Sequence, residues 1–172
     1  MTTQQLHLFN CFYSAVLLVV VYFTRATARR IAGALAGGAT LGVVCLAAIA
    51  LCESLGWWQF TFTWTPLFLL LFYLNLVIAG TPIFLITWRL ARRFGWQGLA
   101  VFLGALTVFG PFRDYWWMAK FPEWGTYATG VAPGLAISAT YFATVTAGHA
   151  VMRLVAGPAR NDRLARLPWE PA

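Results

Sequence analysis

Charged residues are scarce in this chain, and their scarcity excludes a water-soluble globule. Of the 172 residues, 10% are charged and 60% are hydrophobic, and the mean hydropathy is +0.71. A soluble domain carries roughly 25% charged residues, so there is too little polar surface to cover a water-facing fold. The sequence therefore predicts a single-domain integral membrane protein.

Acidic residues are fewer still, with 5 Asp and Glu against 12 Lys and Arg. In a soluble protein such an excess of positive charge suggests nucleic-acid binding. Here the basic residues lie in short clusters at the ends of apolar segments, where they indicate membrane topology instead. We therefore predict no nucleic-acid partner. All but one of the basic residues are arginine, and this bias, together with abundant alanine, suggests a GC-rich bacterial genome.

Histidine and cysteine are too few to build a metal site. The two histidines, His7 and His149, are expected at opposite faces of a hydrocarbon core roughly 30 Å thick, so they cannot ligate one haem. No CxxC, HxxxH or HxxE spacing occurs, which argues against zinc and di-iron sites. We predict no metal and no cofactor. We interpret His149 as a satisfied helix-end histidine, with a functional role as the alternative.

Two of the three cysteines, Cys11 and Cys52, are expected near the outer interface. A disulfide between them would survive in an oxidising periplasm. We favour two buried apolar thiols and keep the disulfide as the alternative.

Long apolar runs fill most of the chain. A spanning helix needs about 20 mostly apolar residues. Five segments qualify, at about residues 8–24, 31–55, 66–88, 97–117 and 131–153. The predicted fold is all-α, a bundle of five transmembrane helices in a domain of residues 1–157, followed by a polar cytoplasmic tail of residues 158–172.

Basic residues fall on one side of this five-pass chain. Ten of the 12 follow the first, third and fifth segments: Arg25, Arg29, Arg30, Arg89, Arg92, Arg93, Arg153, Arg160, Arg163 and Arg166. Short cytoplasmic loops accumulate basic residues, so the N-terminus is predicted outside and the C-terminus in the cytoplasm. No basic residue precedes the first apolar segment, which argues against a cleavable signal peptide. The predicted location is the bacterial cytoplasmic (inner) membrane.

The opposite, outer face collects tryptophans and the remaining charges. We predict an outer loop from Arg113 to Trp124, with Glu53 at the same depth. The candidate ligand-binding residues are Glu53, Trp57, Trp58, Arg113, Asp114, Tyr115, Trp116, Trp117, Lys120, Glu123 and Trp124. Interfacial anchoring explains the same residues, and this alternative stays open.

Two carboxyl groups in this loop are candidates for catalysis. A carboxyl group at a half-dry interface can serve as a general acid, a role for Asp114 or Glu123, while Arg113 would orient a polar head. Residues adjacent in sequence do not face each other on a helix. Arg113 and Asp114 are therefore each expected to need another partner.

The third apolar segment is predicted to be interrupted at mid-depth. Asn75 is polar, and Thr81 and Pro82 follow at a point where Pro82 removes a helical hydrogen bond. Broken helices at mid-depth can mark an ion or substrate site, which makes these three residues a candidate site. We favour a kink satisfied by Thr81 and a neighbouring helix.

The second segment carries two GxxxG motifs, from Gly33 to Gly37 and from Gly38 to Gly42. Such motifs permit close helix approach. We favour packing within the monomer over a homodimer seam.

These patterns favour a non-catalytic membrane protein. It would bind an apolar ligand, or a larger membrane complex, through the outer aromatic face while embedded in the lipid bilayer. The first alternative is an intramembrane enzyme acting on a lipid or isoprenoid. The second is a carrier that uses the break in the third segment.

Overall fold

The computed structural model describes residues 2–62 and 64–159. Most of the predicted tail, including Arg160, Arg163 and Arg166, therefore lies outside the described residues. The described chain is almost entirely helical, with two short strands. In order, the elements are α1 (Thr3–Thr24), α2 (Ala28–Ser54), β1 (Trp58–Phe60), α3 (Pro66–Lys120), the 3-10 turn η1 (Pro122–Trp124), β2 (Gly125–Tyr127) and α4 (Ala132–Ala156).

Threonine residues begin three of the four α-helices. Thr2 accepts from the backbone of Gln5 and completes a capping box at the start of α1. Thr27 caps α2, and Thr65 caps α3 ahead of Pro66. A threonine hydroxyl satisfies a backbone N–H that the first turn leaves unpaired, and proline at the first helical position costs no hydrogen bond. These local signals fix where the helices start.

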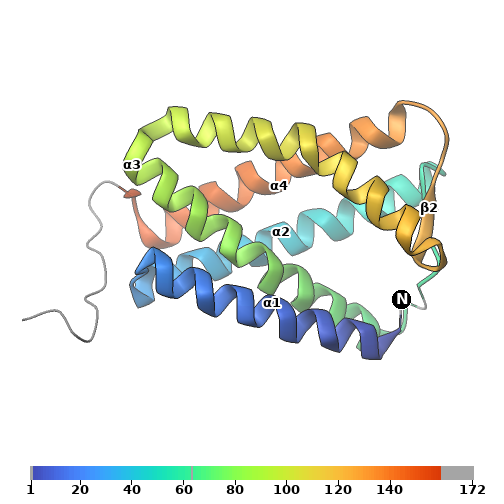
Figure 1. The fold of residues 1–172 in the computed structure, drawn as a ribbon, viewed down its shortest axis with the longest axis horizontal. Coiled ribbons are helices and arrows are strands. Elements are labelled where there is room, and N and C mark those ends of the chain that lie inside the picture. The colour runs from blue at the N-terminus through green and yellow to red at the C-terminus, as the bar shows by residue number, and fades with distance from the viewer. Residues whose placement is uncertain (1, 63, 160–172) are drawn as a thin grey trace, which may run out of the picture.

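Helix α3 folds back on itself at Gly95, whose φ of 64° and ψ of −147° are not helical. Figure 1 shows the chain reversing there, so α3 has a first arm (residues 66–94) and a second arm (residues 96–120). A straight helix of 55 residues would be about 80 Å long, far beyond one membrane thickness. The third and fourth predicted segments thus lie within this one element.

The predicted outer loop from Arg113 to Trp124 overlaps the predicted fourth segment of about residues 97–117, and the structure is helical in that overlap. The second arm stays helical to Lys120, so Arg113 and Asp114 lie on a helix. Pro111 does not end that helix, and Gly110 beside it packs directly against the ring of Tyr141. Tertiary packing here overrides the local tendency of proline to interrupt a helix.

Four helices are long and apolar enough to cross a membrane: α1, α2, α3 and α4. This agrees with the predicted all-helical membrane protein. Helix α1 ends, α2 begins, α3 reverses and α4 ends at one end of the bundle (Figure 1). Of the charged residues that the structure describes, the arginine clusters adjoin that end, while Glu53, Asp114 and Glu123 belong to the opposite half.

Helix α2 packs between α3 and α4 through its glycines. A Cβ added at Gly33 would lie 2.6 Å from the Cβ of Ala156 on α4, and one added at Gly38 would lie 2.6 Å from the carbonyl oxygen of Val77 on α3. Each GxxxG motif therefore contributes to close helix packing inside the monomer. That is the use we favoured from the sequence.

The two strands cover one end of the bundle. They pair antiparallel, with Trp58 opposite Tyr127 and Phe60 opposite Gly125. Trp58 is buried and packs with Cys52 and Ile137, so the strands join the tops of α2 and α4. This cap places aromatic residues directly over the interior described next.

Candidate functional site

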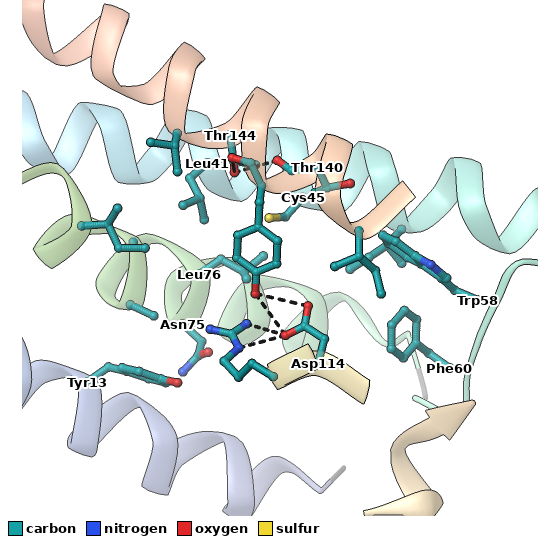
Figure 2. A pocket seen from close by; sticks show the side chains of 18 of the residues that line it. Tyr13, Leu41, Cys45, Trp58, Phe60, Asn75, Leu76, Asp114, Thr140 and Thr144 are labelled. Carbon is teal, nitrogen blue, oxygen red and sulfur yellow. Dashed lines mark hydrogen bonds and ion pairs between the residues drawn. The ribbon is translucent and has the colours of Figure 1, made fainter. Parts of the chain in front are cut away.

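A cavity of about 330 Å³ lies inside the bundle beneath the strand cap. All four helices and both strands contribute to its wall, and the close-up in Figure 2 shows most of the lining side chains. The wall is largely aliphatic and aromatic, with residues such as Leu41, Ile83 and Phe60. Its size lies within the range of ligand pockets, about 300–1,000 Å³.

One polar cluster lies on this wall, formed by Arg113, Asp114 and Tyr141. Arg113 donates to Asp114 Oδ1 from Nη2 at 2.6 Å and from Nε at 2.9 Å. The hydroxyl of Tyr141 donates to the same carboxylate, at 3.0 Å from Oδ1 and 3.2 Å from Oδ2 (Figure 2). The Arg113 side chain is 61% exposed and that of Asp114 22%, so the cluster reaches from the cavity to the molecular surface.

The expectation that Arg113 and Asp114 would not pair is wrong. Their Cα–Cβ directions differ on the helix, but the long arginine side chain folds back to the neighbouring carboxylate. Tyr141 adds a third member from α4, and the guanidinium lies 5.4 Å from the centre of its ring. The pair is therefore held from two helices.

Gly110 explains why Tyr141 reaches Asp114. Gly110 and Asp114 are four residues apart on α3 and therefore lie on one face of that helix. A Cβ at position 110 would lie 2.4 Å from a ring carbon of Tyr141, so only glycine lets the ring rest against α3 one turn before the carboxylate. Close approach of α3 and α4 and the polar cluster thus depend on the same residue.

Asn75 is a second polar side chain on the wall. It is 8% exposed, and its Nδ2 donates to Asn10 Oδ1 on α1 at 3.1 Å. The helix interruption predicted at Thr81 and Pro82 is wrong, because α3 continues through Pro82. Thr81 donates to the carbonyl of Val77 at 2.7 Å and is fully buried. Of the three mid-depth candidates, Asn75 lines the cavity, and Thr81 and Pro82 serve packing.

Two phenols on the wall, those of Tyr13 and Tyr127, can donate a proton to a ligand. Trp58 also lines the cavity, but its Nε1 is buried and has no hydrogen-bond partner among the described residues. Burial raises the pKa of the Tyr127 phenol above its ordinary value, and the nearby Asp114 carboxylate raises it further. The phenol therefore stays protonated and can act as a donor at neutral pH.

Phe84 follows the lining residue Ile83 on α3 and lies on the side of the cavity that faces the arginine clusters. Its side chain is fully buried and fills the space between Gly37 on α2 and Gly148 on α4, where a Cβ would lie 3.0 Å and 2.2 Å from the ring. Leu85, Trp88 and Met152 continue this packed layer. The residues of this layer are fully buried and pack α2, α3 and α4 together at the arginine end of the bundle.

The structure brings together part of the predicted outer site. Arg113, Asp114 and Trp58 line the cavity. Trp117 and Trp124 instead stack with Phe121, and Lys120 lies 5.9 Å from the ring of Trp116.

Three further predicted residues hold the strand cap. Glu53 accepts from the backbone N–H of Phe60 at 3.3 Å. The backbone carbonyl of Trp57 accepts from Ala128 at 2.9 Å. Tyr115 packs against Tyr127, with ring centres 4.8 Å apart. Glu123 is exposed, and among the described residues nothing engages its carboxylate.

Sequence reasoning missed the three tyrosines that line the cavity, Tyr13, Tyr127 and above all Tyr141. A signal for it exists: Thr140, Tyr141 and Thr144 place polar groups at helical spacing in an apolar segment. Tyr13 has a similar signal, because the polar residue Asn10 lies three positions before it in an apolar segment. Its phenol points toward Asn75 in Figure 2.

The remaining candidates are structural. Nδ1 of His149 lies 3.1 Å from Oγ1 of Thr87, so this is a satisfied helix-end histidine, as favoured. The three cysteines are free, and Cys52 is buried, but Cys11 is exposed because its part of α1 packs on one side only. Among the described residues, no group of three or more His, Cys, Asp or Glu is placed to hold a metal.

No family model, no curated protein and no solved structure matches this chain. The class that the fold supports is an all-helical protein with four helices able to span a membrane. Function has to be argued from the cavity itself.

Proposed function

We propose that this protein binds a small apolar molecule with one polar end inside its helix bundle. The observation that carries the proposal is the position of the Arg113–Asp114–Tyr141 cluster on the wall of an otherwise apolar cavity. A concave apolar wall with a few convergent polar groups is the usual form of a ligand site. The polar end would meet the cluster, and the apolar part would lie against Leu41, Ile83 and their neighbours.

This proposal moves the predicted site inward from the outer aromatic face. The stacking of Trp117, Phe121 and Trp124 on one another supports a structural role for that face. The aromatic cap then serves to roof the cavity. The Asp114 carboxylate on the cavity wall is only 22% exposed, and partial burial of a charge is costly, which favours a reason for its presence beyond stability.

We further propose that both arms of α3 cross the bilayer, so that the chain passes five times through a bacterial cytoplasmic membrane. The N-terminus would lie outside. The support is the gathering of arginines near one end of the bundle, because cytoplasmic loops accumulate basic residues. The cavity cluster would then lie in the outer half of the membrane.

Mass spectrometry of the protein purified in mild detergent tests the binding proposal. We expect wild type to carry a near-stoichiometric apolar molecule with one polar end. Ala79→Phe puts bulk into the cavity wall and should abolish this co-purification. Ala100→Phe adds the same bulk at an exposed position and should not. Equal amounts in the two variants, or no bound molecule in wild type, would refute the proposal.

A second candidate is an intramembrane enzyme that acts on a lipid or isoprenoid at the same cluster. The observation in its favour is the hydrogen bond from Tyr141 to Asp114, along which a proton can pass at the cavity wall. Glu123, the other predicted acid, is exposed and does not line the cavity. A folded Asp114→Asn variant would accumulate an unconverted, different molecule if the protein is an enzyme, and the wild-type molecule if it only binds.

A further inference from the structure

We infer that an anionic phospholipid binds where α3 reverses, with its phosphate beside Arg89 and Arg93 and one acyl chain in a groove between the two arms of the helix. This groove shares no lining residue with the cavity of the proposed function. It supplies an apolar wall at the arginine end of the bundle, and the arginines supply positive charge that no described carboxylate neutralises.

The groove has a volume of about 510 Å³ and an almost wholly apolar wall. Two residues of the first arm and five of the second line it: Leu90, Phe94, Gln97, Gly98, Val101, Phe102 and Ala105. Ala105 lies ten residues beyond Gly95, which is about 15 Å along a helix. One leaflet occupies half of a hydrocarbon core roughly 30 Å thick, so the groove has the length of an acyl chain in that leaflet.

Gly98 forms the floor of the groove. A Cβ added there would lie 2.8 Å from the Cβ of Phe94 and 3.3 Å from the carbonyl oxygen of Leu90, so the second arm starts directly against the end of the first. The walls stay uncovered, because Phe94 is 53% exposed and Val101 74%. The described chain thus leaves this apolar groove to a molecule from the bilayer.

Positive charge gathers at the mouth of the groove. Arg89 and Arg93 are four residues apart and lie on one face of the first arm. The guanidinium of Arg93 lies 5.2 Å from the centre of the Phe94 ring, which is part of the wall. The charges of Arg92, Arg25 and Arg93 all act on Arg89. An anion placed here would relieve this repulsion between like charges.

Nothing in the described chain balances these charges locally. The three described carboxylates belong to the opposite half of the bundle (Figure 1), and the described ion pair is the one between Arg113 and Asp114 there. A guanidinium can present two N–H groups to one phosphate, and Arg93 is exposed. Basic pockets between membrane helices bind anionic lipid head groups in this way. A phosphate without a chain would leave the groove empty, and an uncharged lipid would leave the arginines unbalanced.

Three lipids with the same two oleoyl chains test the inference: dioleoyl phosphatidylglycerol, dioleoyl phosphatidylcholine and dioleoylglycerol. Native mass spectrometry of the full chain in mild detergent measures the occupancy of each. We expect phosphatidylglycerol to bind roughly tenfold or more tightly than the other two, because it alone carries a net negative charge. Glycerol phosphate, which has no chains, should not compete. Equal binding of the three lipids, or competition by glycerol phosphate, would overturn the inference.

Arginine variants locate the head group. Arg89→Gln and Arg93→Gln each remove one charge and should weaken phosphatidylglycerol binding by roughly three- to tenfold. Arg93→Lys keeps the charge and should stay within roughly threefold of wild type. Arg153→Gln is the matched control, because Arg153 is an exposed arginine on α4 at the same end of the bundle. An equal loss in Arg153→Gln would show that the charge of the whole end attracts the lipid, and would overturn the site.

A pair of bulky substitutions locates the chain. Ala105→Phe fills the groove and should weaken binding of phosphatidylglycerol and phosphatidylcholine alike. Ala100→Phe adds the same bulk at an exposed position outside the groove and should leave both unchanged. Equal binding in the two variants would overturn the placement of the chain. Because the groove and the cavity have separate walls, each of these results leaves the proposed function to its own test.

Discussion

Asp114 is the residue on which the cavity's polar chemistry converges. It accepts from Arg113 on its own helix and from Tyr141 on α4, and it is the described carboxylate that lines the cavity. A carboxylate held by two donors from different helices has a fixed orientation. Substitution of Asp114 by a residue of similar shape can separate its structural role, which is to link α3 to α4, from a role in binding a ligand.

Asp114→Asn should destabilise the fold by about 1–2 kcal/mol. The amide keeps one acceptor oxygen but loses the charge that Arg113 faces. A fully buried pair would cost about 3–5 kcal/mol to break, and we expect less because Arg113 is 61% exposed and partly screened. Denaturant unfolding in detergent measures the change. Glu123→Gln, at an exposed carboxylate, should stay within about 0.5 kcal/mol of wild type. Equal stability of the two variants would contradict the structural role of Asp114.

Tyr127 predicts how stability changes at alkaline pH. Burial raises the pKa of its phenol above the ordinary value of about 10.0, so the unfolded chain loses this proton at lower pH than the folded protein. The stability that the buried, protonated phenol contributes is fully present below about pH 10. It declines above that pH by at most about 1.4 kcal/mol per pH unit. Melting temperatures between about pH 8 and pH 11 should therefore fall more steeply for wild type than for Tyr127→Phe. Parallel curves would show that the phenol is not shielded.

The second arm of α3 is the least enclosed helical element of the bundle. Between residues 96 and 120, Gly110 is the one residue that is buried. A Cβ added at Gly104 would meet nothing within 4 Å. The arm nevertheless supplies Arg113 and Asp114 to the cavity. Its placement depends on two points, the reversal at Gly95 and the contact between Gly110 and Tyr141.

Gly95→Ala should disturb that placement. The backbone at this position has a φ of 64° and a ψ of −147°, a combination essentially confined to glycine, and forcing it on alanine costs about 1–3 kcal/mol. Gly104→Ala is a matched control in the same arm and should be neutral or stabilising by up to about 1 kcal/mol, because glycine weakens a helix interior. Thermal unfolding of both variants in detergent distinguishes them. A Gly95→Ala variant as stable as Gly104→Ala would show that the reversal does not need glycine.

At the scale of the whole molecule, the sequence predicted the helical membrane class and the approximate helix positions. Apolar length and the arginine clusters carry that information locally. The segment predicted to about residue 117 continues as helix to Lys120. The close contact of Gly110 with Tyr141 on α4 could not be predicted in the same way, because the two residues are distant in sequence.

The candidate site was predictable in part. Arg113, Asp114, Trp58 and Asn75 stand out as polar or amphipathic groups in apolar segments. Their meeting with Tyr13 and Tyr141 follows from helix arrangement, which no local pattern encodes. The ion pair between adjacent residues also runs against the spacing rule for helix surfaces, since that rule describes Cβ directions and not the reach of a long side chain.

The five-pass arrangement can be tested on the full chain. In a variant without natural cysteines, a cysteine at Thr129, in the exposed loop after β2, should react with a membrane-impermeant maleimide in intact spheroplasts. A cysteine at Arg93, beside the reversal of α3, should react only after lysis. Labelling of both before lysis would refute the proposed orientation and the second crossing of α3.

The packed layer around Phe84 has a thermodynamic consequence. Under the proposed binding function and five-pass orientation, a molecule bound above this layer would exchange with the outer leaflet and be separated from the inner one by Phe84, which fills the gap between Gly37 and Gly148. Its occupancy would then follow the abundance of the molecule in that single leaflet. On these proposals, a difference in concentration across the membrane would not be transmitted through the cavity in this conformation.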